Sequence, residues 1–231
     1  QKFIEDPLIA ARLVSVFAGF GSVVGIYFLA KELFSERIAR MSSLLYVILP
    51  FTLLYDRLAL FDSLLTMLGI FAVYLSIKMA KNPRLDLALL NGFAIGFAMI
   101  TKSSGNFFLY LLPFSLLLFN FRQKMILKNL SKWVGLSLVT FALSQIIYNS
   151  LRLSPLFYVI ERKNYEFIRS YTEIINNPFL FAFSNLKSLI LWLATYTSLP
   201  LFILFVICLI WGYLKKDQKI IYLSILIIIP F

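Results

Sequence analysis

Apolar runs recur along the whole chain at close to the length that crosses the ~30 Å hydrocarbon core of a bilayer. Of the residues, 61% are hydrophobic and only 14% are charged, so the folded chain must have a large surface that water does not cover. The sequence therefore predicts an all-α, polytopic transmembrane helix bundle with about seven complete spans and a partial eighth. The spans are expected at about 8–30, 39–55, 60–80, 86–101, 104–121, 133–150 and 188–213, with the eighth beginning near 220.

We expect residues 1–231 to form a single transmembrane domain that is a fragment of a larger membrane domain. The last apolar run extends for only about twelve residues before Phe231, which is too short to cross a bilayer. The N-terminal end of the sequence is equally abrupt.

Basic residues indicate which loops face the cytoplasm. They cluster in alternate predicted loops, which places these loops inside and the N-terminus of the sequence outside. The net charge of +11 follows from this topology and predicts no nucleic-acid partner, because no basic face is interleaved with aromatic residues. The clusters are Lys31, Arg37 and Arg40; Lys78, Lys81 and Arg84; Arg122, Lys124, Lys128 and Lys132; and Lys215, Lys216 and Lys219.

The longest outer loop, at about 151–187, has its own helical pattern. Apolar residues such as Ile160, Phe167 and Tyr171 recur at helical spacing with charged residues such as Arg162 and Glu166 between them. This pattern predicts an amphipathic helix lying on the outer membrane surface, and a helix packed against other outer loops is the alternative.

The residue types limit the available chemistry. The chain has no histidine, and its one cysteine, Cys208, lies inside an apolar run. An intramolecular disulfide is therefore excluded, and the commonest metal ligand and general base are missing. Any reaction must use carboxylates, Lys, Arg, Tyr or the backbone.

Small residues at helix-packing spacing occur as Gly21-x-x-x-Gly25 and Gly92-x-x-x-Gly96. The missing side chains let two helices approach closely, so these pairs predict helix contacts and carry no function of their own.

Arg12 is the first ionisable residue that needs an explanation. It shares a helical face with Ser15, Gly19 and Ser22, and this face is expected to look into the bundle. An inward arginine needs an anion, whereas an arginine that extends to the membrane interface is the alternative.

Asp62 lies inside an apolar run, where a charge requires a partner or a task. Thr66, one turn further on, extends a polar stripe. We interpret Asp62 as a carboxylate that lines an outward-facing polar cavity. A structural bridge from Asp62 to Arg57 or Lys102 is the alternative, and Asp56 is interpreted as an exposed loop charge.

Lys102 stands in a short turn between two spans, followed by Ser103, Ser104 and Gly105. Backbone amides, two hydroxyls and an ammonium group gather there, an arrangement that suits a phosphate. An ordinary interfacial lysine is the alternative.

The order of these features resembles the GT-C superfamily of polyprenyl-phosphate-sugar-dependent glycosyltransferases, especially the branch of protein O-mannosyltransferases and the lipid A aminoarabinose transferase. The resemblance runs from about Ile9 to Phe121. It rests on Ala10-Ala11-Arg12-Leu13, on Ala30-Lys31-Glu32-Leu33-Phe34 with Arg37-Ile38-Ala39, on Arg57 to Asp62, and on Gly92-Phe93-Ala94-Ile95-Gly96-Phe97-Ala98-Met99-Ile100-Thr101-Lys102.

The resemblance implies transfer of a sugar, with inversion, from a polyprenyl-phosphate-linked donor to a lipid, glycan or protein acceptor on the outer face. It implies Asp62 as a catalytic carboxylate at the family's second acidic position and Lys102 as the donor-phosphate lysine. Arg12, Arg57 and Ser103 are expected to bind substrate. A divalent metal is conceivable through Asp62, although one carboxylate does not make a metal site.

The family's principal catalytic acid belongs to an outer loop that we expect to precede this sequence. Glu5 and Asp6 would be the last residues of that loop, and neither is assigned as the base.

Two other classes of function compete with this interpretation. A transporter or lipid flippase usually has charges and broken helices near the membrane midplane. Here the selected charges lie at outer ends, and no paired Gly/Pro interruptions or inverted repeats are visible. A non-catalytic subunit that binds a partner or a lipid headgroup at its outer edge is the third interpretation.

Overall fold

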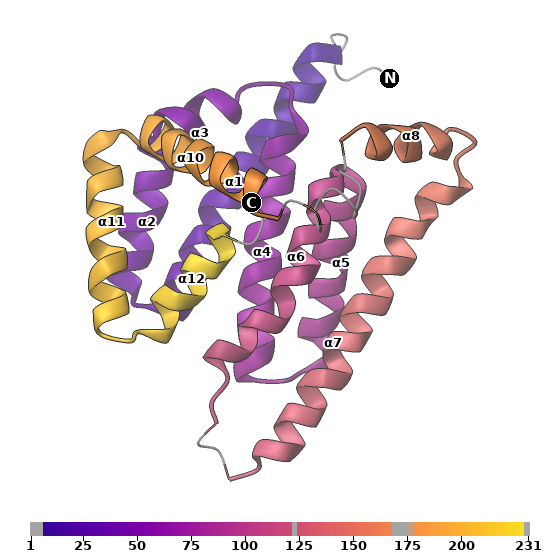
Figure 1. The fold of residues 1–231 in the computed structure, drawn as a ribbon. Helices are drawn as coiled ribbons and strands as arrows, with labels where there is room; N and C mark the ends of the chain where they lie inside the picture. The colour runs from indigo at the N-terminus through magenta and orange to yellow at the C-terminus, as the bar shows by residue number, and fades with distance from the viewer. Residues whose placement is uncertain (1–6, 122–123, 168–175, 177, 229–231) are drawn as a thin grey trace. The chain divides into compact units, whose positions relative to one another are not determined.

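The computed structural model describes residues 7–121, 124–167, 176 and 178–228. The regular structure of these residues is helical, which confirms the predicted all-α class (Figure 1). The helices are α1 Pro7–Leu33, α2 Glu36–Ile48, α3 Pro50–Tyr55, α4 Phe61–Lys81, α5 Leu85–Thr101, α6 Asn106–Leu111, α7 Ile126–Asn149, α8 Phe157–Phe167, α10 Pro178–Thr197, α11 Leu199–Leu214 and α12 Gln218–Ile228, with the 3₁₀ helices η1 Ser103–Gly105, η2 Leu112–Leu118 and η3 Ser150–Leu153.

The chain forms two compact units, Gln1–Tyr148 and Asn149–Phe231, called unit 1 and unit 2 below. That both units belong to one transmembrane domain stays a prediction.

The first helix shows which kind of solvent surrounds unit 1. The buried face of α1 consists of small residues, among them Ser15, Gly19 and Ser22, whereas Phe17 and Phe20 are 71% and 70% exposed. A water-soluble helix has the opposite arrangement, with its large apolar residues inside. Small residues inside and large apolar residues outside are typical of helices packed within lipid.

Helices α1 and α4 run parallel in close contact. A Cβ atom on Gly25 would lie 2.8 Å from Ile70 Cγ2, and one on Gly21 would collide with the side chain of Met67. At the far end of the pair, Lys81 Nζ lies 2.8 Å from Glu32 Oε1. The first predicted glycine pair is therefore confirmed as a helix contact.

The second glycine pair brings α5 against α7. A Cβ atom on Gly96 would lie 2.8 Å from Ile147 Cδ1, and one on Gly92 would lie 3.0 Å from Leu143 Cβ. At both pairs a neighbouring helix thus packs directly against the glycines, as expected from the sequence.

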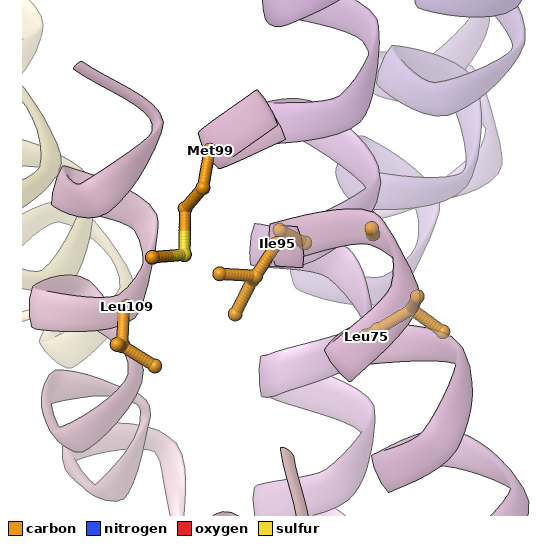
Figure 2. Packing of buried hydrophobic residues seen from close by; sticks show 6 residues of the cluster. Leu75, Ile95, Met99 and Leu109 are labelled. Atoms are coloured by element: carbon orange, nitrogen blue, oxygen red, sulfur yellow. The ribbon is translucent and has the colours of Figure 1, made fainter. Parts of the chain in front are cut away.

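The apolar core of unit 1 lies between α4, α5 and α6. Figure 2 shows Leu75 of α4, Ile95 and Met99 of α5, and Leu109 of α6 gathered in one cluster. Ile95 is fully buried and Met99 is 2% exposed. This packing fixes the ends of α4 and α5 relative to each other.

Buried hydrogen bonds add to this packing. Asn91 Nδ2 donates to Ser76 Oγ at 2.9 Å, and Ser76 Oγ donates to the carbonyl of Ala72 at 2.7 Å. Thr140 Oγ1 of α7 donates to the carbonyl of Ala88 at 3.0 Å. Such bonds between helices replace the water that the bilayer does not supply.

Among the residues that the structure describes, three helices are long and apolar enough to cross a membrane: Pro7–Leu33, Phe61–Lys81 and Ile126–Leu153. They correspond to the spans expected at 8–30, 60–80 and 133–150. The span expected at 86–101 is a helix of 17 residues, α5. The count of seven spans is not confirmed and stays a prediction.

Two runs in which single spans were expected, 39–55 and 188–213, are each interrupted. The first run is divided at Leu49, whose ψ of 128° is extended, and the second at Ser198, which has a φ of 69°. The run expected at 104–121 continues from α6 into the 3₁₀ helix η2. Each of the three runs contains a proline near the change, namely Pro50, Pro200 and Pro113, and proline removes a backbone donor and restricts the preceding residue.

Unit 2 contains the outer loop that was expected to carry an amphipathic helix. Helix α8, Phe157–Phe167, occupies its first part, and residues 168–175 lie outside the described residues. Helix α10 begins at Pro178, before the expected span start at 188, with proline in the first turn where it is tolerated. That the loop helix lies on the outer membrane surface stays a prediction.

Candidate functional site

The topology of unit 1 brings the predicted site residues to one end of the bundle. Helices α1 and α4 begin at this end, α3 ends there, and α5 ends there before turning into η1 (Figure 1). We call it the Lys102 end and the opposite one the Lys81 end. The site residues at the Lys102 end are Arg12 in α1, Arg57 after α3, Asp62 in the first turn of α4, Lys102 at the end of α5 and Ser103 in η1.

An ion pair joins α4 to the end of α5. Lys102 Nζ lies 2.8 Å from Asp62 Oδ1. Asp62 lies at the positive end of the α4 dipole and Lys102 at the negative end of the α5 dipole, so each charge is favourably placed. The contact between Asp62 and Lys102 that the sequence allowed is present, and the role of Asp62 in lining a polar cavity stays a prediction.

This ion pair is accessible. The side chains of Lys102 and Asp62 are 52% and 43% exposed. An ammonium group has three N–H donors, so Lys102 can contact Asp62 and still donate to a second anion.

The turn after Lys102 is held by the backbone. Lys102 N–H donates to the carbonyl of Ala98 at 3.0 Å, and Gly105 N–H donates to the carbonyl of Lys102 at 2.8 Å. The side-chain amide of Asn106 donates to the carbonyl of Ser103 at 2.9 Å. A Cβ atom on Gly105 would collide with the Ala98 backbone, so only glycine fits here.

Arg12 begins the polar face of α1. Ser15 is 1% exposed and Ser22 is fully buried, and Gly19 between them is also buried, which confirms that this face looks into the bundle. Arg12 itself is exposed at the start of the face.

Arg12 and Arg57 line the same pocket. The pocket has a volume of about 540 Å³, and its other walls are apolar. Among the described residues, neither guanidinium has a carboxylate within ion-pair distance. Two arginines that lack a carboxylate partner in this part of the chain are suited to an anionic ligand. The apolar walls are Pro50, Leu53, Leu54 and Leu58.

Asp56 is not the exposed loop charge that the sequence suggested. Its side chain is partly buried, and Oδ2 accepts a hydrogen bond from Tyr46 Oη at 3.2 Å. A Cβ atom on Gly19 would lie only 2.6 Å from Asp56 Oδ2, so the carboxylate lies directly on α1. Sequence reasoning missed this contact because its partners are distant along the chain.

The possible metal site has no support from a ligand cluster. Within the described residues, no group of three or more His, Cys, Asp or Glu side chains gathers. Among the described residues, the Lys102 end holds the carboxylate of Asp62 bound to the ammonium group of Lys102, and the guanidinium groups of Arg12 and Arg57 line a nearby pocket.

The helical fold, the lipid-compatible surface and the cationic side chains at one bundle end define an integral membrane protein with a charged site at one end. Comparison with protein families gives a match over residues 2–148 to the family described as dolichyl-phosphate-mannose-protein mannosyltransferase. The chain belongs to this family and is a membrane glycosyltransferase. The match confirms the resemblance to the GT-C superfamily.

The matched residues cover almost all of unit 1 and include Arg12, Arg57, Asp62, Lys102 and Ser103. No curated protein and no solved structure matches the chain.

Proposed function

We propose that this protein transfers a sugar from a polyprenyl-phosphate-linked donor to an acceptor hydroxyl or amine at the outer membrane face. Lys102, Arg12 and Arg57 bind the donor phosphate, with Ser103 beside them, and Asp62 is the carboxylate next to the reacting sugar. The donor's isoprenoid tail lies among membrane lipids and helices. The acceptor is a lipid, a glycan or a protein.

The observation that carries this proposal is the accessible ion pair. Asp62 holds Lys102 Nζ at 2.8 Å, while about half of each side chain remains exposed. A structural bridge is better protected when it is buried, whereas a cation held in place and open to its surroundings is ready for a phosphate. The family description names a lipid-linked sugar, dolichyl-phosphate-mannose, and the matched residues include this ion pair.

The proposed reaction is a displacement at C1 of the donor sugar. The acceptor oxygen or nitrogen forms a bond to C1 while the bond from C1 to the phosphate oxygen breaks. The electron pair leaves with the polyprenyl phosphate, where Lys102 stabilises the developing negative charge. Asp62 stabilises positive charge that develops at C1, and the acceptor's proton passes to a general base. Attack opposite to the leaving phosphate gives inversion.

Donor turnover by the full-length protein in proteoliposomes tests this proposal. Polyprenyl-phosphate-mannose is the first donor to try, because the family description names a mannosyl donor. We expect Asp62→Ala and Lys102→Ala each to lower kcat/KM by about 100-fold, as the loss of a charge-stabilising group does in other enzymes. Near-wild-type rates in both variants would refute the site.

Lys81→Ala is the matched control. Lys81 forms an ion pair of the same length, 2.8 Å, with Glu32 at the opposite end of unit 1. The substitution removes the same kind of interaction away from the proposed site, so its turnover is expected to stay within about twofold of wild type.

A transporter is the competing function. One argument against it was that the sequence shows no paired helix interruptions, and the structure weakens this argument. Leu49 and Ser198 interrupt runs that were expected to be continuous. The family match still favours the enzyme. Movement of the lipid-linked sugar across the bilayer without its turnover would favour the transporter.

A further inference from the structure

The segment from Tyr55 to Asp62 carries two of the proposed site residues, and its backbone is fastened from both sides. Ser63 Oγ donates to the carbonyl of Tyr55 at 3.3 Å, and Ser15 Oγ donates to the carbonyl of Leu60 at 3.1 Å. Ser15 and Ser63 are 1% and 3% exposed. These buried hydroxyls hold the segment against α1 and α4.

The Asp56 side chain provides a third attachment, next to Arg57. Its Oδ2 accepts the hydrogen bond from Tyr46 of α2 at 3.2 Å and lies over Gly19 of α1. Its own N–H donates to the carbonyl of Thr52 at 2.9 Å. Asp56 therefore links α1, α2 and the end of α3.

The negative charge of Asp56 is not used to neutralise its neighbour. Among the described residues, Asp56 has no cation within ion-pair distance. Arg57 follows it directly and lines the pocket that Arg12 also lines. The two adjacent side chains therefore have different contacts. Asp56 contacts the helices, whereas Arg57 lines the pocket and can bind a ligand there.

We propose that Asp56, through its contacts with Tyr46 and Gly19, is a positioning residue that holds Arg57 beside Arg12 for binding of the donor phosphate. The kinetic part of this inference rests on the proposed function, whereas the placement of Arg57 can be tested without turnover. If Tyr46 or Gly19 is replaced, the Asp56 carboxylate loses one of its contacts. The segment that carries Arg57 can then shift.

Three variants disturb this contact from different helices: Asp56→Asn, Tyr46→Phe and Gly19→Ala. We expect each to raise the KM for polyprenyl-phosphate-mannose by about tenfold while kcat stays within about twofold, because donor binding and not the chemical step is affected. A residue with a purely structural role would lower the amount of folded protein and leave KM unchanged. Wild-type KM in both Tyr46→Phe and Gly19→Ala would overturn the proposal.

Asp86→Asn is the matched control. Asp86 forms an ion pair with Arg84 at 2.7 Å, at the Lys81 end of unit 1. The substitution removes a carboxylate interaction remote from Arg57, so the KM of this variant is expected to equal that of wild type.

A second measurement follows the position of residue 57 directly. In the full-length protein with Cys208→Ser, an Arg57→Cys variant is labelled with a membrane-impermeant maleimide. We expect Gly19→Ala and Tyr46→Phe to change the labelling rate by at least about threefold. The reactivity of a cysteine at position 57 depends on how its segment opens and on what the side chain contacts. Asp86→Asn is expected to leave the rate unchanged.

The two measurements separate the two proposals. A changed labelling rate in the Arg57→Cys series, together with no turnover of polyprenyl-phosphate sugar by the protein that retains Arg57, would reject the proposed function and keep the positioning role. An identical labelling rate in all variants would reject the positioning role, whatever the turnover.

Discussion

Lys102 and Asp62 form an ion pair whose exposure decides what it contributes. With side chains 52% and 43% exposed, the pair is screened by its surroundings. We predict that Lys102→Met changes the free energy of unfolding by less than about 1 kcal/mol, as for other exposed pairs. Reversible denaturation in detergent micelles measures this change. A loss of several kcal/mol would show that the pair is mainly structural.

Asn91 is a polar residue of the opposite kind, because it is fully buried and lies away from the proposed site. Its side-chain amide donates to Ser76 Oγ at 2.9 Å. We predict that Asn91→Ala lowers the free energy of unfolding by about 1–3 kcal/mol through the lost bond and the cavity.

A double-mutant cycle with Ser76→Ala isolates the hydrogen bond between Asn91 and Ser76. Its coupling energy is expected near 0.6 kcal/mol, about the average for such bonds in membrane proteins. Full additivity of the two substitutions would contradict a direct bond, and donor turnover by both single variants should remain close to wild type.

Single residues also show how far the sequence could predict the site. The pattern of Ser15, Gly19 and Ser22 placed one face of α1 inside the bundle, and the structure confirms it. The interpretation of Asp56 was wrong because its contacts with Tyr46 and Gly19 depend on how three helices meet, which helical periodicity does not contain.

Among the helices, proline explains the main difference between expectation and structure. The runs at 39–55 and 188–213 are apolar enough to suggest single spans, and hydropathy alone contains no information about a break. Pro50 and Pro200 supply that information locally, since each removes a backbone hydrogen bond. Leu49, directly before Pro50, accordingly leaves the helical conformation with a ψ of 128°.

The contact between α5 and α7 gives a prediction about whole helices. A methyl group on Gly96 would lie 2.8 Å from Ile147 Cδ1, whereas one on Gly135 would have nothing within 4 Å. We predict that Gly96→Ala destabilises the protein by about 1–3 kcal/mol, because the helices must separate or the isoleucine must shift. Gly135→Ala is expected to stabilise it by up to about 1 kcal/mol through helix propensity.

Thermal and chemical unfolding of both variants in the same detergent measures this contrast. Because the two substitutions are chemically identical, any difference between them reports the helix contact. Equal effects of Gly96→Ala and Gly135→Ala would contradict the close approach of α5 and α7.

At the scale of the whole molecule, the exposed side chains indicate which solvent surrounds the protein. Exposed apolar side chains such as Phe17, Phe61 and Leu138, at 71%, 73% and 64%, would aggregate in water and are stable in lipid. Helix α5, with 17 residues, is about 25 Å long and spans a bilayer only where the bilayer is locally thin. Length and composition therefore identify an integral membrane protein more firmly than they count its spans.

The distribution of charge predicts the orientation of the chain in the membrane. Lys78 and Lys81 lie in the last turn of α4 and Arg84 directly precedes α5, so this cluster predicts that the α4–α5 turn lies inside and the Lys102 end outside. Single cysteines in a Cys208→Ser background test this with a membrane-impermeant maleimide on intact cells.

We predict that Leu58→Cys and Ser154→Cys are labelled in intact cells, whereas Asn82→Cys and Lys128→Cys are labelled only after permeabilisation. The first two positions precede α4 and follow η3, and the other two lie at the opposite helix ends. The exact reverse pattern would invert the orientation and place the proposed transfer reaction inside. Labelling of Leu58→Cys and Asn82→Cys from the same side would mean that α4 does not cross the membrane, because these two residues lie on either side of that helix.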